Sequence, residues 1–115
     1  MKIITNKITK KELAENYSNY FKTLIKAVVD IKKEIIALDA ELHADLEAYL
    51  LENSSKQDDL WGINLYPLKE RRDFIEYTSL INIRPHQDNA AMEVKSDAIR
   101  RQINAIVDKL VDYGA

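Results

Sequence analysis

The sequence contains no cysteine, which excludes two classes of small protein. Without thiols the chain can form neither a disulfide framework nor a thiolate metal site. Only two glycines are present, so a glycine-rich phosphate loop is absent, and no serine stands in a nucleophile elbow. We therefore find no support for nucleophilic catalysis and expect no cofactor.

The chain also lacks a long apolar segment and an excess of positive charge. No apolar run approaches the ~20 residues that cross a bilayer, and residues 1–7 lack the apolar stretch of a secretory signal. Lys and Arg number 17 against 19 Asp and Glu, a formal net charge of −2. Because phosphate binding draws on clustered Lys and Arg, a nucleic-acid partner is not expected. We expect a cytoplasmic protein with no membrane partner.

The composition is that of an ordinary globular protein. Apolar residues make up 46% and charged residues 31% of the 115 residues. A chain of this length has room for one hydrophobic core. We therefore expect a single domain over residues 1–115.

Helical signals stand near both ends of the chain. A capping box, Thr9 to Glu12, precedes apolar residues at helical spacing and predicts a helix over 10–22. Ser96 caps a second apolar stripe, for which Gly114 would be the C-cap. Residues 1–4 are expected to form a short edge strand.

Residues 24–53 can be interpreted in two ways. The β-branched stretch 24–31 and the return stretch 34–41 favour a hairpin that turns at Lys32-Lys33, followed by a helix over 44–53. Apolar residues after Lys32 also fit a period of 3.6, so one long helix from Lys32 to Glu52 is the rival. Periodicity alone does not choose between them.

A second pair of strands is predicted over 60–66 and 74–84, with a charged hairpin tip between them. In the first strand Trp61, Ile63 and Leu65 alternate with more polar residues, so we expect Trp61 in the core. The predicted class is α+β: an antiparallel sheet of about four to five strands in two hairpins, with helices packed mainly on one face.

The alternation of these strands defines a candidate binding surface. Asn is a poor strand former, so its presence in the middle of both strands suggests a specific role. Arg84 would be a bidentate clamp for a carboxylate or phosphate. Cross-strand pairing on an exposed face, or a polar dimer contact, is the alternative. The polar face contains Asn64, Tyr66, Glu76, Thr78, Asn82 and Arg84, with Leu80 also on it.

A second group lies at Glu41, His43 and Asp45, with His86 as a further candidate. On a strand the first three would share one face and suit a divalent metal or a His–Asp general base. Alternatively the segment is a solvent-facing edge, and Asp45 caps a helix.

Two hypotheses for the function follow from these candidate residues. One is a non-enzymatic binding or assembly module for a protein partner, a second copy of the chain or a small anionic ligand. The other is a small hydrolase or metal-assisted enzyme using His43, Asp45, Asn64 and Arg84.

Five further motifs of the sequence are Ala27-Val28-Val29-Asp30-Ile31, Glu41-Leu42-His43-Ala44-Asp45, Leu50-Leu51-Glu52-Asn53, Leu60 to Pro67 and Ile81-Asn82-Ile83-Arg84-Pro85. Together these motifs resemble a family of short bacterial and archaeal proteins catalogued as a domain of unknown function. The resemblance covers about residues 28–103. It implies a strand and turn over 35–41, where relatives can carry adjacent glycines, and thus favours the hairpin over the long helix. It implies no activity.

Overall fold

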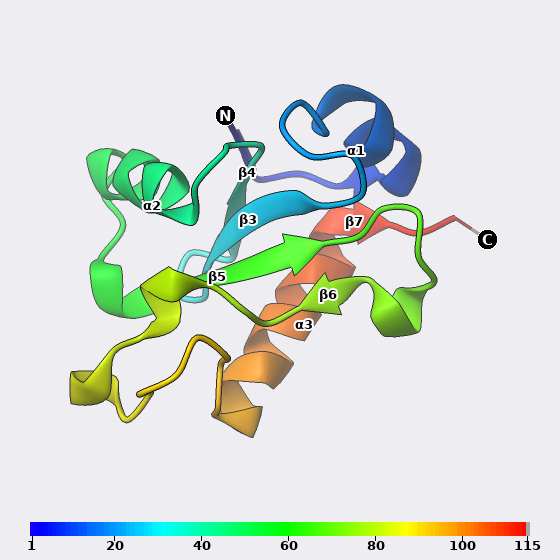
Figure 1. Cartoon of the computed structure of the whole chain (residues 1–115). Helices are drawn as coiled ribbons and strands as arrows, with labels where there is room; N and C mark the ends of the chain where they lie inside the picture. The colour runs from blue at the N-terminus through cyan, green and yellow to red at the C-terminus, as the bar shows by residue number, and fades with distance from the viewer. Residues whose placement is uncertain (115) are drawn as a thin grey trace.

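The computed structural model describes residues 1–114 and has an α+β fold (Figure 1). Its main sheet has five antiparallel strands in the order β1-β4-β3-β5-β6, and a small parallel sheet pairs β2 with β7. The predicted class and the predicted β3–β4 hairpin are confirmed, and the second predicted hairpin forms only where β5 pairs with the two residues of β6. The strands are β1 (Lys2–Ile4), β2 (Ile8–Thr9), β3 (Ile25–Asp30), β4 (Ile35–Leu38), β5 (Leu60–Leu65), β6 (Ile75–Glu76) and β7 (Val111–Asp112). The helices are α1 (Lys10–Asn16), α2 (His43–Glu52) and α3 (Asp97–Leu110).

The β3–β4 hairpin shows that the long-helix alternative over residues 32–52 is wrong. Asp30 Oδ1 accepts hydrogen bonds from the amides of Lys32 and Lys33, each at 2.9 Å, and so stabilises the turn. Glu34 and Asp39 have φ angles of 57° and 72°, a left-handed conformation that no continuous α-helix contains. The helix that follows, α2, agrees closely with the predicted range 44–53.

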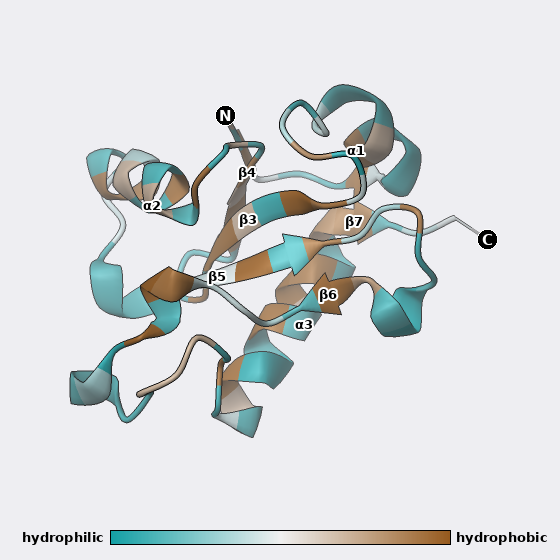
Figure 2. Cartoon of the chain, in the orientation of Figure 1, coloured by the Kyte–Doolittle hydropathy of each residue, from teal (hydrophilic) through white to brown (hydrophobic). Residues whose placement is uncertain are grey.

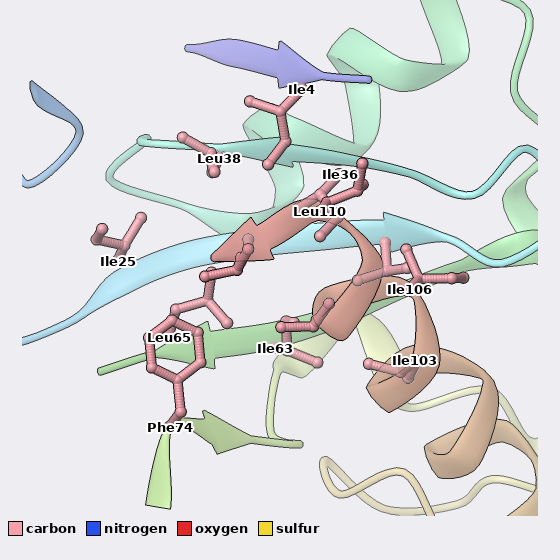
Figure 3. Close-up of a cluster of buried hydrophobic side chains, with 14 of the residues drawn as sticks. Ile4, Ile25, Ile36, Leu38, Ile63, Leu65, Phe74, Ile103, Ile106 and Leu110 are labelled. Carbon is pink, nitrogen blue, oxygen red and sulfur yellow. The ribbon is translucent and has the colours of Figure 1, made fainter. Parts of the chain in front are cut away.

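Helices cover both faces of the sheet. The larger core lies between α3 and one face, where Ile103 and Ile106 pack against the side that bears Ile63 (Figure 3). Trp61 belongs to this core and is 1% exposed, as predicted. Leu13 of α1 packs in the same cluster. The expectation of helices mainly on one face therefore holds for α1 and α3.

The other face is covered by α2, so the helices do not all lie on one side of the sheet. Leu46 and Leu50 of α2 pack against Val28 and Leu60 in a second, smaller core. Figure 2 shows hydrophobic colour along much of β3 and β5, whereas hydrophilic and hydrophobic colours alternate along the helices. The centre of the sheet is thus buried from both sides.

Two helix ends differ from the predictions. The helix predicted over 10–22 starts at its capping box but ends at Asn16, because Asn19 bonds elsewhere: its backbone amide donates to Asp39 Oδ1. The side chain of Asn19 also donates to the carbonyl of Asn16 at 3.2 Å, and polar side chains that bond to nearby backbone groups compete with helix continuation. The last helix ends at Leu110 rather than at the predicted cap Gly114, since Val111–Asp112 pairs with β2 as β7. Strands of two residues carry no periodic signal in the sequence.

The strand predicted over 74–84 is mostly wrong. Only Ile75–Glu76 pairs with β5, and the chain then leaves the sheet to form a 3₁₀ turn at Leu80–Asn82 and another at Pro85–Gln87. This departing segment crosses very close to β5. A Cβ atom added to Gly62 would lie 2.5 Å from the Cβ of Ser79, so the crossing requires glycine at this position.

Gly62→Ala is therefore expected to destabilise the protein by about 1–3 kcal/mol, because the added methyl group overlaps Ser79. Urea unfolding of the four members of a double-mutant cycle measures this. In the Ser79→Gly background the same Gly62→Ala change should cost much less. Equal costs in both backgrounds would show that the crossing is not as close as described.

Candidate functional site

Arg84, the predicted clamp for an anion, is 3% exposed, and its side chain bonds to other parts of the protein. Its guanidinium donates to the backbone carbonyls of Ile81, Gln57 and Leu60. It also lies 3.6 Å from a carboxylate oxygen of Glu47, and 4.7 Å from the ring centroid of Trp61. Burial lowers the pKa of Arg84, and Glu47 opposes this shift. Backbone oxygens therefore take up donors that a clamp for a carboxylate or phosphate would need.

Asn82 is also buried and pairs with the edge of β5. Its Oδ1 accepts from the Gly62 amide at 2.8 Å, while its Nδ2 donates to the Gly62 carbonyl at 2.9 Å. The side-chain amide thus replaces a neighbouring strand at this residue. A second bond from Nδ2, to the carbonyl of Met92 at 3.0 Å, ties in the following loop. Asn82, one of the two asparagines predicted in the middle of a strand, therefore bonds to the backbone of the protein itself.

Asn64, Tyr66 and Glu76 form a small polar group where β5 meets β6. Asn64 Nδ2 donates to Glu76 Oε1 at 2.7 Å, and the Tyr66 hydroxyl donates to the same oxygen at 3.0 Å. Burial and the bond to Glu76 raise the pKa of Tyr66. Asn64 Nδ2 also donates to the carbonyl of Thr78 at 3.3 Å. Among the described residues, Asn64 Oδ1 is buried and has no donor.

His43 begins α2 and lies against the same strand. Its Nε2 is 2.8 Å from the carbonyl oxygen of Ile63, and because a carbonyl only accepts, Nε2 carries the proton. Burial lowers the pKa of His43, although the bond to Ile63 opposes this. The imidazole is therefore neutral at pH 7, and Nδ1 is an acceptor.

His43 and Asn64 line one hollow, between the start of α2 and the segment that leaves β6. Its volume is about 390 Å³. Lys26 lies directly across from Asn64 in the β3–β5 pair and contributes a further part of the wall. The rest of the lining is largely apolar. The lining residues are Lys26, Leu42, His43, Ala44, Asn64, Thr78, Ser79, Leu80, Ile81 and Met92.

Several apolar side chains at this hollow are exposed to solvent. Leu80 is 71% exposed, Leu42 53% and Met92 41%. Exposed apolar residues are unremarkable when scattered, but a group around one concave site is typical of a binding surface. Two sequence patterns indicated part of this site: Leu80 falls on the predicted polar face, and Lys26 interrupts an apolar strand. Met92 also lines the hollow, but it lies in a loop, and no pattern in the sequence indicated this position.

The remaining predicted residues lie elsewhere. Asp45 lines a different hollow, with Glu41 and Tyr49, so it does not meet His43. His86 is exposed and lies 3.6 Å from a carboxylate oxygen of Asp58. Within residues 1–114, no three His, Asp or Glu side chains are grouped so that they could hold a metal ion. The Glu41–His43–Asp45 group is not assembled, because His43 starts a helix instead of continuing a strand.

These features define a small α+β protein with a largely apolar hollow that is also lined by His43 and Asn64. The chain belongs to the family described as "Protein of unknown function (DUF5674)", whose family model matches residues 2–110. This match confirms the resemblance to a family of unknown function. Comparison with curated proteins and with solved structures gave no match. Over the described residues, no helix has both the length and the apolar character needed to cross a membrane.

Arg84→Ala is expected to destabilise the protein by about 3–5 kcal/mol, because Glu47 and the backbone oxygens would lose a buried partner. Urea unfolding measures the loss. Arg71→Ala is the control, since Arg71 also pairs with a carboxylate, that of Asp108, but at a more exposed position. If both variants lost the same small amount of stability, Arg84 would not hold the fold as described.

Stability should fall as the pH drops from 7 to 5, in part because of His43. Its pKa in the folded protein lies below the ordinary value of 6.5, so the unfolded chain takes up the proton first as the pH falls. The stability that the neutral side chain of His43 contributes is present in full above pH ~6.5. It is lost as the pH falls below this value, by at most about 1.4 kcal/mol per pH unit. Unfolding free energies across this range should show a shallower slope for His43→Gln than for wild type. An equal slope in His43→Gln and wild type would contradict the assignment.

Proposed function

We propose that this protein is a non-enzymatic binding module and that its ligand is a small, largely apolar molecule held in the hollow over His43 and Asn64. The observation that carries this proposal is the group of exposed apolar side chains around a concave site. A bound apolar molecule would remove Leu42, Leu80 and Met92 from water, and this burial favours binding.

The size and lining of the hollow support a small molecule as the occupant. Sites for small molecules are typically concave, mostly apolar and about 300–1,000 Å³ in volume, with a few polar groups that orient the ligand. The hollow has about 390 Å³ and holds polar groups at His43 and Asn64. Both residues are fixed by hydrogen bonds to the fold, so the polar floor is preorganised.

The enzymatic alternative has less support. A His general base is usually oriented by a carboxylate, whereas the Nε2 atom of His43 donates to a backbone carbonyl. Asp45 lies in a different hollow, and the donors of Arg84 bond to backbone oxygens. The residues proposed for hydrolysis are therefore not brought to one point.

Indole, a neutral and mostly apolar molecule, is the probe for a test by backbone amide NMR of the full chain. We expect shifts centred on amides of residues 42–44, 63–64 and 78–81. Leu80→Lys should weaken indole binding about tenfold or more, since a buried leucine contributes at least ~1.4 kcal/mol. Leu68→Lys is the matched control, because Leu68 is also highly exposed, at 78%, but does not line this hollow.

Two results would count against the proposal. One is an absence of indole shifts around the hollow, or equal binding by both variants. The other is that the same amides shift with protein concentration when no indole is present. That second result would assign the apolar group to contact between two copies of the chain.

A further inference from the structure

We infer that the ligand of the hollow is a carboxylate with an apolar body, and that Lys26 is the residue that pairs with its charge. This inference rests on the function proposed above and adds the chemical class of the ligand. The anion contact predicted for Arg84, whose donors bond to backbone oxygens, is thereby moved to a different strand.

Lys26 lies in β3, the middle strand of the five-stranded sheet, where lysine is an uncommon residue. Its chain neighbours Ile25 and Ala27 are 2% and 0% exposed and belong to the larger core. Val28, the next residue on the same face as Lys26, is buried under α2, whereas Lys26 is partly exposed and lines the hollow. The sheet therefore brings one positive charge to the hollow.

This charge has no carboxylate partner within residues 1–114, since none of the ion pairs there includes Lys26. Its Nζ instead lies 5.0 Å from the ring centroid of Phe21, a cation–π contact. By contrast, Arg71 and Arg84, which are also partly or fully buried, both pair with carboxylates. A carboxylate ligand would give Lys26 the kind of partner that these arginines have within the fold.

The lining of the hollow supplies no competing negative charge. Among the described residues that form it there is no Asp or Glu, and His43 is neutral at pH 7. Glu76 bonds to Asn64 without being part of the lining, and its Oε1 already accepts from Asn64 and Tyr66. The formal charge that a ligand meets in the lining is therefore positive.

The charge of Lys26 also acts on the imidazole of His43. Burial is the largest cause that lowers the pKa of His43, and the positive charge of Lys26 lowers it further. The negative charge of Glu76 raises this pKa, but by less than Lys26 lowers it. At the imidazole, positive charge thus outweighs negative charge, which favours an anion at this end of the hollow.

The apolar part of the ligand follows from the rest of the lining. Leu42, Leu80 and Met92 offer no hydrogen bonds from their side chains, so they favour an apolar body. A phosphate group carries close to two negative charges at pH 7, whereas the lining has one positive charge, so a carboxylate is the better match. Benzoate has this design, and benzamide has nearly the same shape without the charge.

Benzoate and benzamide, titrated separately into the full chain at low salt and followed by backbone amide NMR, test the inference. We expect benzoate to bind in the hollow about fivefold more tightly than benzamide, the upper range for an ion pair at a protein surface. Added NaCl should weaken the binding of benzoate and leave that of benzamide nearly unchanged.

Three variants assign the charge to its residue. In Lys26→Met, which keeps an apolar side chain and removes the charge, the preference for benzoate should disappear. Lys26→Arg should keep the preference, because the charge is retained. Lys22→Met is the control, since Lys22 is exposed and does not line the hollow, and this variant should also keep the preference.

Each outcome has a distinct meaning. If benzamide binds the wild-type hollow as tightly as benzoate, the inference is wrong but the hollow is still a ligand site. If Lys26→Met keeps the preference for benzoate, Lys26 is not the charge partner and the inference is wrong. If neither compound shifts an amide of the hollow, the inference is wrong, and the indole titration decides separately on the proposed function. The comparison in wild type does not depend on any variant, so it decides the question of charge even if Lys26→Met fails to fold.

Discussion

The fold depends on how the backbone N–H and carbonyl groups at the outer edge of β5 find hydrogen-bond partners beyond the short stretch that pairs with β6. At Gly62 the side-chain amide of Asn82 bonds to both the backbone N–H and the carbonyl, and at Leu60 the guanidinium of Arg84 bonds to the carbonyl. Unpaired backbone groups in a buried strand are costly, so these two side chains replace a missing strand. They also fix the turn at Leu80–Asn82, which forms one wall of the hollow.

Arg84 connects this edge to both sides of the sheet. Its guanidinium lies against the ring of Trp61, which belongs to the core under α3, and near the carboxylate of Glu47, which lies on α2. A charged group in this position is tolerated because several carbonyls accept its donors. Residues close to Arg84 in the chain therefore line the proposed ligand site, whereas Arg84 itself does not.

The parts of the fold that the sequence could predict are those with local signals. The hairpin of β3 and β4 follows from β-branched residues around a charged turn, and the burial of Trp61 follows from strand alternation. The course of residues 77–84 could not be predicted, since Asn82 bonds to a strand twenty positions away through its side chain. For the site, His43 and Asn64 could be found as polar residues at unusual places. Leu42 and Met92 could not, because their exposure depends on how separate segments meet.

The parallel pair of β2 and β7 has a consequence for the order of folding. Ile8 pairs with Val111, so two strands of two residues each join segments separated by almost the whole described chain. Closing so long a loop costs chain entropy that a few backbone bonds do not offset. We therefore expect the pair to form late, after α1 and α3 have packed on the sheet and brought β2 and β7 together.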